Sequence, residues 1–284
     1  STGRPDTICA GSACTIQDAD YDFDVEGNLT ARAKGTTGPN GYREAFTYDA
    51  LNRLKTATLT LANGAPSNIA LTTLAYDKLG NICSKNANNY TYAGKAGCAG
   101  SSGTASPHAV SAAFGKTYQY DANGNLTFSD AAGTANDRTL TYTAENQAAT
   151  ISTPTVTSRF VYGPDQARYK RTDQRASGPN AGTTITRYVG SLEFIQLPNG
   201  TSQVKRYVAG VAMIVTQSGT PTVSPYYLFS DHLGSIERIA NANGTVVEAM
   251  SFDSHGTRRD ALDWQGAAAS LPQLTTHGFA GLEH

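Results

Sequence analysis

One short phrase recurs along this chain and constrains its fold more than any other feature. Its clearest copy is Tyr120-Asp121-Ala122-Asn123-Gly124-Asn125-Leu126-Thr127. Asp is favoured at the first position of a type I turn because its carboxylate accepts N–H bonds within the turn, and Gly at the fourth position allows a positive φ. A type I turn followed by a left-handed residue is a common hairpin loop with a bulge. The phrase therefore predicts strand, turn and strand.

Worn copies of the phrase start at residues 23, 48, 76, 120 and 142, which are 25, 28, 44 and 22 residues apart, and a late copy starts at residue 252. A loose period in the twenties indicates one supersecondary unit per repeat. The residues expected to form the turns and repeats are Phe23, Asp24, Gly27, Tyr48, Asp49, Tyr76, Asp77, Gly80, Tyr120, Asp121, Gly124, Asp231, Gly234, Phe252, Asp253 and Gly256. Each repeat aspartate is more economically a turn acceptor than a catalytic carboxylate.

Independent turn and strand signals agree with a chain of hairpins. Asn-Gly, a strong hairpin marker, begins at Asn40, Asn63, Asn123, Asn199 and Asn243. Strand-like runs between the turns cover residues 184–189, 192–197, 204–208, 212–216, 226–229 and 246–252. The apolar run at 208–215 is interpreted as a buried strand, and residues 258–274 as loop or a short helix. No convincing amphipathic helix appears, so the fold class is expected to be all-β.

Composition narrows the classes of partner. Charged residues make up 16% of the 284 residues, and the formal net charge is −1. Nucleic-acid binding is therefore not expected, since it needs a basic patch or stripe. No apolar stretch reaches the roughly 18 residues of a membrane helix. Nothing in the sequence indicates a cofactor.

The four cysteines fall into two local pairs. Cys9 and Cys14 are spaced to close a short loop, and Cys83 and Cys98 flank a polar insertion. Without a Cys-x-x-Cys pair, metal binding is not expected. Two disulfides would indicate an oxidising compartment. Four free thiols in a cytosolic protein are the alternative.

Candidate chemical sites are weak. Ser230-Asp231-His232 has the residue types of a hydrolase triad, but adjacent side chains on a strand point to opposite faces. None of the histidines pairs at metal-ligand spacing; they are His108, His232, His255, His277 and His284. The 15 tyrosines suit a sugar-stacking surface, but their alternation beside turns favours packing between strands. No catalytic or metal-ligating residue is assigned.

The ordered series of phrases resembles the YD repeats of bacterial Rhs proteins, which also occur in insecticidal Tc-toxin components and animal teneurins. The most specific part is YYLFSDHLGSIERIANANGTVVEAMSFDSHGTRRD at residues 226–260, followed by THGFAG at 276–281. SPHAVSA at 106–112 and YGPDQARYKR at 162–171 are also typical. The resemblance extends over roughly residues 20–281.

The resemblance implies a strip of consecutive antiparallel hairpins that forms a curved, spirally wound sheet, part of a β-shell or a small barrel. In complete members the shell encloses a C-terminal toxin domain, and the core ends in a region resembling an aspartyl autoprotease with an Asp-Pro-x-Gly signature. This sequence contains no Asp-Pro dipeptide, so the protease is not carried over. Exposed sheet edges predict self-association.

These observations lead to a hypothesis for organisation and function. Residues 1–20 form an N-terminal segment, 21–257 the repeat sheet, and 258–284 an irregular segment whose last three residues resemble the start of a tag. The leading function is a non-enzymatic wall for a toxin cargo, in a parent that is secreted or on the bacterial cell surface. The alternatives are a module that binds carbohydrate or a cell-surface receptor, and the remnant of an autoproteolytic toxin precursor.

Overall fold

The structure, a computed structural model, describes residues 3–35, 41–61, 70–92, 95–99, 107–130, 137–178, 180–220, 222–268 and 274–283. In this part of the chain no residue belongs to an α-helix, and the strands pair antiparallel with their neighbours. The all-β prediction with consecutive hairpins is thus confirmed. Asn40, Asn63 and His284 lie outside the described residues.

The chain divides into two compact units. Unit 1 comprises Ser1–Thr73, Val208–Met213 and Ser224–His284, and unit 2 comprises Leu74–Tyr207 and Ile214–Val223. Strands β6 (Ala70–Tyr76), β20 (Ser202–Val208), β21 (Ala212–Gln217) and β22 (Val223–Ser230) have residues in both units. The division predicted at residues 20 and 257 stays a prediction.

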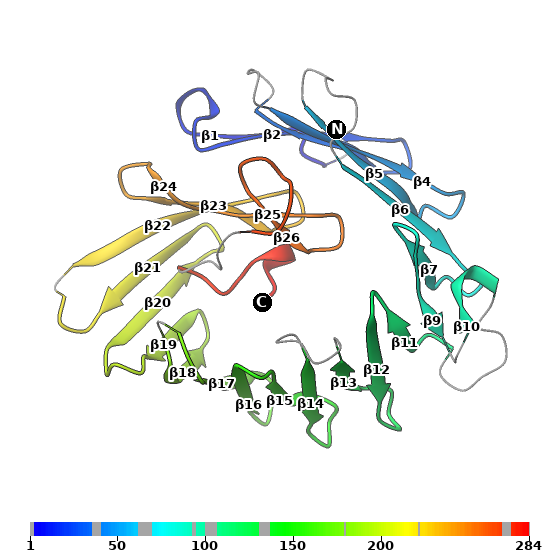
Figure 1. Cartoon of the computed structure of the whole chain (residues 1–284). Helices are drawn as coiled ribbons and strands as arrows, with labels where there is room; N and C mark the ends of the chain where they lie inside the picture. The colour runs from blue at the N-terminus through cyan, green and yellow to red at the C-terminus, as the bar shows by residue number, and fades with distance from the viewer. Residues whose placement is uncertain are drawn as a thin grey trace. The chain divides into compact units, whose positions relative to one another are not determined.

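Unit 1 is built from strands in two layers (Figure 1). The first layer contains β1 (Thr7–Ala10), β2 (Gln17–Phe23), β3 (Leu29–Lys34), β4 (Tyr42–Tyr48) and β5 (Leu54–Leu61), with the 3-10 turn η1 (Ser12–Cys14). The second contains most of β22 with β23 (Ile236–Asn241), β24 (Val246–Ala249), β25 (Ser251–Phe252), β26 (Arg258–Arg259) and η3 (Phe279–Gly281). Apolar side chains of both layers are almost fully buried, among them Leu59, Ile239 and Met250. Unit 1 therefore has an apolar core.

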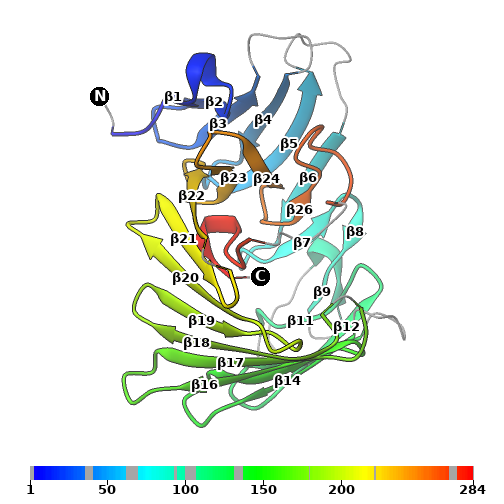
Figure 2. The same cartoon turned by 90° about the vertical axis from the view of Figure 1, so that its left-hand side faces the viewer.

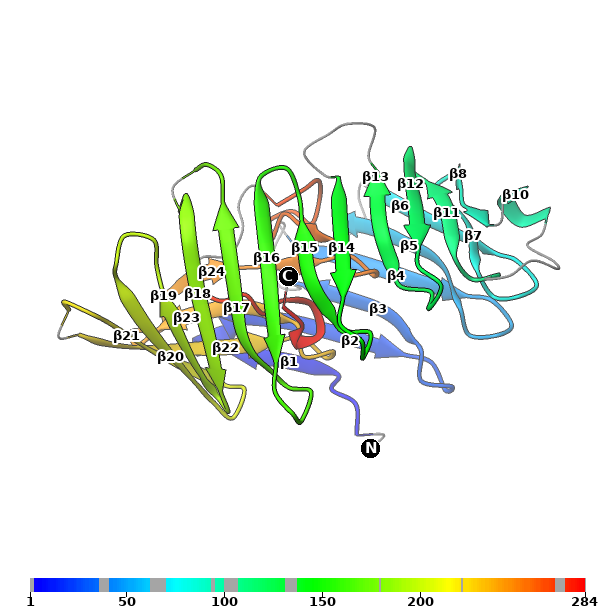
Figure 3. The same cartoon turned by 90° about the horizontal axis from the view of Figure 1, so that it is seen from below.

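Unit 2 is a succession of hairpins. Its strands are β7 (Ile82–Lys85), β8 (Asn88–Asn89), β9 (Thr91–Tyr92), β10 (Lys95–Ala96), β11 (Val110–Ala113), β12 (Lys116–Tyr120), β13 (Leu126–Asp130), β14 (Arg138–Tyr142), β15 (Ala148–Ser152), β16 (Val156–Tyr162), β17 (Arg168–Arg175), β18 (Gly182–Val189) and β19 (Leu192–Gln196), followed by β20, and η2 covers Gly97–Ala99. The hydrogen-bonded order is β10-β9-β11 and then sequence order to β20. The strands from β12 onward run side by side in one layer (Figures 2 and 3).

The structure contradicts the strand predicted at residues 208–215 and shows which elements form within residues 258–274. Residues 208–215 do not form a single buried strand, because Ala209 and Gly210 have positive φ and the Val211 amide donates to the Val208 carbonyl. Val211 is 61% exposed. A hairpin turn thus divides the run between β20 and β21. Within residues 258–274, Arg258 and Arg259 form β26, and residues 261–263 form a turn.

Candidate functional site: the repeat turns

Each repeat aspartate accepts hydrogen bonds from its own turn. In the turn after β12, the Asp121 amide donates to the Asn125 carbonyl at 3.0 Å, and the Gly124 amide donates to the Asp121 carbonyl at 3.1 Å. Asp121 Oδ1 accepts the amides of Asn123 and Asn125, both at 2.9 Å, and Oδ2 accepts the Asn125 side-chain amide at 3.0 Å. Chiefly through this last bond, the pKa of Asp121 is lowered. Its carboxylate is thus fully engaged as a turn acceptor.

The same turn recurs along the chain with small changes. Asp24, Asp49, Asp77, Asp231 and Asp253 each accept the amide four residues later, at 2.7–3.0 Å. Among the described residues, five further turns with the same pair of backbone bonds begin without an aspartate, at Thr143, Gly163, Leu197, Asn241 and Gly278. The first position of these turns is not an aspartate, although Asn and Thr also accept turn amides through their side-chain oxygens.

A bulge follows each of four repeat turns, and the strand pairing is offset in the same way at all four. Phe23, Tyr48, Tyr76 and Tyr120 each pair with the residue six positions later, and the register shifts one residue further into the hairpin. This offset requires a left-handed residue at the fourth turn position. Gly124 takes φ 85° there, and Asn52 takes the same position with φ 58°.

The left-handed asparagines also connect neighbouring repeats. Asn28 donates its side-chain amide to Asn52 Oδ1 at 3.1 Å, and Asn125 donates to Asn146 Oδ1 at 2.9 Å. Asn146 occupies its left-handed position with φ 61°. A glycine would adopt this backbone more easily but has no side-chain acceptor. Asn52 and Asn146 therefore each supply the left-handed residue of their own turn and accept a hydrogen bond from the preceding turn.

The repeat tyrosine bonds to the preceding repeat. The Tyr48 hydroxyl donates to the Leu29 carbonyl, Tyr142 to Leu126, and Tyr162 to Ala148, each at 2.8 Å. Each acceptor is the residue directly after the previous turn. Burial raises the pKa of Tyr48 and of Tyr142. The repeat tyrosine thus links successive hairpins by a hydrogen bond. The sequence alone predicts only that it packs between strands.

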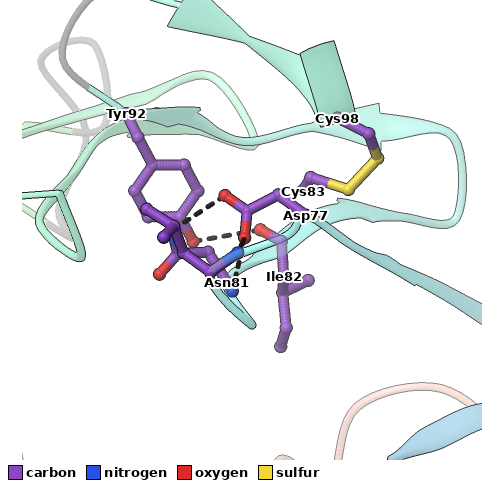
Figure 4. Close-up of a disulfide and its surroundings, with 7 residues drawn as sticks. Asp77, Asn81, Ile82, Cys83, Tyr92 and Cys98 are labelled. Atoms are coloured by element: carbon purple, nitrogen blue, oxygen red, sulfur yellow. Dashed lines mark hydrogen bonds between the residues drawn. A yellow bond between two sulfur atoms is a disulfide. The ribbon is translucent and has the colours of Figure 1, made fainter. Parts of the chain in front are cut away.

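The insertion between the third and fourth copies is fixed to the turn before it. Cys83 and Cys98 form a disulfide, as do Cys9 and Cys14, so both predicted pairings are confirmed. Beside Cys83, the Tyr92 hydroxyl donates to the Ile82 carbonyl at 3.0 Å (Figure 4), and burial raises the pKa of Tyr92 to about 12. His108 Nδ1 lies 2.7 Å from Asn81 Oδ1. The insertion is therefore bonded, at three points, to residues 81–83 at the end of the Asp77 turn and the start of β7.

Unit 1 contains a buried ionic cluster that no sequence motif indicated. Glu44 on β4 accepts from Arg32 on β3 at 2.7 Å and from Arg259 on β26 at 2.9 Å, with 9% or less of each side chain exposed. Arg32 also donates to the Phe252 carbonyl at 2.6 Å, and the Arg259 guanidinium lies 4.6 Å from the Trp264 ring centroid. Paired in this way, Glu44 has a lowered pKa, although burial by itself would raise it. The cluster joins the two layers of the unit.

The residues of the hydrolase-like trio are not arranged as a relay. Asp231 Oδ1 accepts the amides of Leu233 and Ser235, while the His232 ring lies 4.6 Å from the Tyr21 ring. His232 Nδ1 is buried without a partner in the part of the chain that the structure describes, and burial lowers the pKa of His232. The described residues also contain no cluster of three or more metal-ligating side chains and no helix suited to crossing a membrane.

The repeat geometry coincides with a family match. Residues 23–66, which include the first two Tyr-Asp turns, match the family model described as RHS Repeat. The chain contains an RHS repeat. This match confirms the resemblance to Rhs and YD-repeat proteins that the sequence suggested. A search of curated proteins found no match.

One of two similar solved structures is close enough to indicate a common fold with this chain. The crystal structure of TcdB2-TccC3 matches with a TM-score of 0.51 and 14% identity, covering 94% of this chain and 13% of that one. The structure of the Photorhabdus luminescens Tc holotoxin pore with the mutation TccC3-D651A matches with a TM-score of 0.41 and 16% identity, covering 94% and 19%. Only the first likeness is high enough to indicate a common fold. The chain spans a small part of the length of either protein.

Proposed function

We propose that this chain is a non-enzymatic wall segment, in which RHS-repeat hairpins form part of a β-shell around a C-terminal toxin domain of the parent protein. The single observation that carries the proposal is the Tyr-to-carbonyl bond between successive repeats, by which Tyr48, Tyr142 and Tyr162 each bond to the preceding hairpin. A wall needs such cross-links because an isolated two-stranded hairpin is only marginally stable in water. The RHS-repeat match and the fold shared with TcdB2-TccC3 support it.

The disulfides support a destination outside the reducing cytosol. Cys9–Cys14 and Cys83–Cys98 are both oxidised, and such bonds persist in secreted and surface proteins. The parent is accordingly proposed to be secreted or displayed on the bacterial cell surface. Its proposed partners are the toxin cargo and a second copy of the chain at the sheet edges.

The alternative of a tyrosine-lined sugar surface gains no support from the tyrosines themselves. Tyr48, Tyr120, Tyr142 and Tyr162 are half-buried, and their hydroxyls donate to backbone carbonyls. Hydroxyls engaged in this way are poor candidates for binding sugar hydroxyls. A wall function accounts for both their position and their bonds.

Protease protection tests the proposal. The parent protein would be produced with both this chain and the proposed toxin domain. Cleavage of the toxin domain would then be measured over time after a protease is added. We expect the domain to resist cleavage beside the wild-type wall. In a Tyr48→Phe/Tyr142→Phe/Tyr162→Phe variant, we expect faster cleavage as the hairpins separate.

A matched variant separates loss of the bonds from loss of hydroxyls in general. Tyr169→Phe/Tyr227→Phe removes hydroxyls from side chains that are 48% and 47% exposed, and it should leave protection unchanged. Equal cleavage of the downstream domain in wild type and as a free domain would overturn the enclosure. If both tyrosine variants protected the domain equally well, the bonds between repeats would not be the cause of the protection.

A further inference from the structure

One face of the unit 2 sheet carries a line of cations, here called the basic band: Arg159, Lys170, Arg187 and Arg206. They come from β16, β17, β18 and β20. The strand register places them on the same face, because Lys170 pairs with both Val161 and Arg187, and Arg187 pairs with Phe194. Arg159 and Arg206 join that face by the two-residue alternation of a strand.

The basic band has no internal counter-charge. Within β15 to β20 the acidic residues are Asp173 and Glu193, and both alternate onto the opposite face. There Asp173 binds Ser158 at 2.6 Å and Arg171 at 2.9 Å, and Glu193 pairs directly with Lys205. In the part of the chain that the structure describes, no cation of the band forms an ion pair. Its positive charge is therefore available to a partner.

Stability of the sheet does not explain the band. Lys170 and Arg187 are directly opposite each other, a position where side chains lie about 5 Å apart and like charges destabilise the pair. Arg159, Arg187 and Arg206 are exposed, and Lys170 is half-buried. An anionic ligand would convert this repulsion into attraction.

The arrangement of the band favours a linear ligand. The cations follow one another across the strands, which are about 4.8 Å apart. On β19 the cation is replaced by Phe194, which is 39% exposed and opposite Arg187; Val161, also 39% exposed, lies opposite Lys170. A row of charges with an aromatic ring in it suits an extended chain that has regularly spaced anions and apolar C–H faces between them.

We propose that the basic band binds a linear anionic polysaccharide, with its carboxylates or sulfates on the four cations and one sugar ring against Phe194. The charged contacts form through Arg and Lys donors, which suit both oxyanions. The site does not depend on the wall proposed above, because it uses the face of the sheet and requires no enclosed domain. It also differs from the tyrosine surface considered from the sequence, since no repeat tyrosine contributes.

Binding of the whole chain to polygalacturonate and to heparin tests the site. We expect wild type to bind both, with an affinity that falls as salt rises. Lys170→Gln/Arg187→Gln/Arg206→Gln should lose more than about tenfold in affinity, since each released counterion contributes to the salt-dependent term. The control Lys55→Gln/Lys78→Gln/Arg138→Gln removes the same charge from exposed residues elsewhere, and should bind like wild type. Circular dichroism would establish that both variants fold.

The outcomes divide cleanly. Equal weakening in both triple variants would reduce the effect to net charge and overturn the site, as would absence of binding at physiological salt. Phe194→Ala should weaken polysaccharide binding severalfold with the salt dependence unchanged. Binding of single-stranded oligothymidylate as tightly as polysaccharide would replace the proposal by a nucleic-acid site. Light scattering that showed the band variant, but not the control, losing self-association would replace it by a contact with a second copy.

Discussion

The two units of this chain are stabilised differently although both are made of the same hairpins. In unit 1 the buried side chains are largely apolar, with Ile239, Met250 and Leu59 at 2% exposure or less, and an ionic cluster spans the layers. In unit 2 the buried residues of β13 to β20 that the structure describes are polar, for example Ser158, Thr186 and Lys205. Unit 1 has an apolar core, whereas β13 to β20 of unit 2 bury polar side chains between hydrogen-bonded strands.

This difference shows what the repeat itself can supply. The repeat turn provides hydrogen bonds within the turn, and Tyr48, Tyr142 and Tyr162 each add one bond to the preceding hairpin. In unit 1 a second layer, β22 to β26, covers the first (Figure 1), and most of the buried apolar residues lie in this unit; in unit 2 the described buried apolar residues are Leu74, Cys83, Tyr92 and Ala113. We therefore expect substitutions in buried clusters to affect unit 1 most, and substitutions in turns or disulfides to act locally.

The largest effect is expected from Glu44→Ala. This change leaves the guanidinium groups of Arg32 and Arg259 buried without their carboxylate, which costs about 3–5 kcal/mol of unfolding free energy. Hydrogen exchange resolved by segment should show faster exchange in β3, β4 and β26, with β14 to β18 unchanged. Equal acceleration in both units would abolish the distinction between them.

Asp22→Ala provides the matched control for Glu44→Ala. Asp22 pairs with Arg43 at 3.0 Å, but the two side chains are 63% and 45% exposed. An exposed pair of this kind contributes roughly 0–1 kcal/mol. A loss as large as that of Glu44→Ala would mean that burial is not the cause.

The next effect should come from the disulfide of the insertion. Cys83→Ala/Cys98→Ala opens a link across 15 residues, which is worth about 3 kcal/mol in the chain-entropy relation. Cys9→Ala/Cys14→Ala opens a link across 5 residues, worth about 2 kcal/mol by the same relation. Limited proteolysis should give cleavage within residues 86–98 in the first variant alone. Cleavage there in both variants would contradict a local role.

Turn glycines should rank third, and their surroundings decide the order. At Gly124, with φ 85°, an added Cβ meets nothing within 4 Å, so Gly124→Ala should cost only backbone strain, about 1 kcal/mol. At Gly256 in unit 1 the Cβ would lie 2.7 Å from the Phe279 ring, and overpacking adds about 1–3 kcal/mol to that strain. Thermal unfolding of the two variants measures the difference. Equal destabilisation would show that the Phe279 contact is not restrictive.

Much of the fold could be predicted because the repeat encodes it locally. The run at 184–189 lies within β18, and the expected disulfides are formed. The run at 208–215 was misread because its apolar residues hide a turn: Ala209 adopts φ 49° without an Asn or Asp signal. The failure is physical, since hydrophobicity alone does not distinguish a strand from two strands joined by a tight turn.

The buried cluster and the basic band could not be found in the same way. Glu44 and Arg259 are 215 residues apart and meet only because two layers pack. The line from Lys170 to Arg206 depends on register, and a slip of one residue in any hairpin would move a cation to the other face. Local patterns carry no information about either arrangement until the strand pairing is known.

The smallest effect is expected from Asp121→Asn, which separates turn formation from charge. Asn241 naturally fills the same position and accepts the amides of Asn243 and Thr245 through Oδ1, so the variant should keep its turn at neutral pH. The pKa of Asp121 is lowered in the folded chain, chiefly by its bond from the Asn125 side chain. Its charged form therefore stabilises the fold above the ordinary carboxyl pKa of about 4, and this contribution is lost as pH falls through the folded pKa. Melting temperatures of wild type and variant should converge as the solution is acidified, whereas Glu145→Gln, which removes an exposed carboxylate from the neighbouring turn, should not reproduce the convergence. A constant difference at every pH would mean that the aspartate acts through its shape alone, and the turns of both units would then be equivalent whichever acceptor they carry.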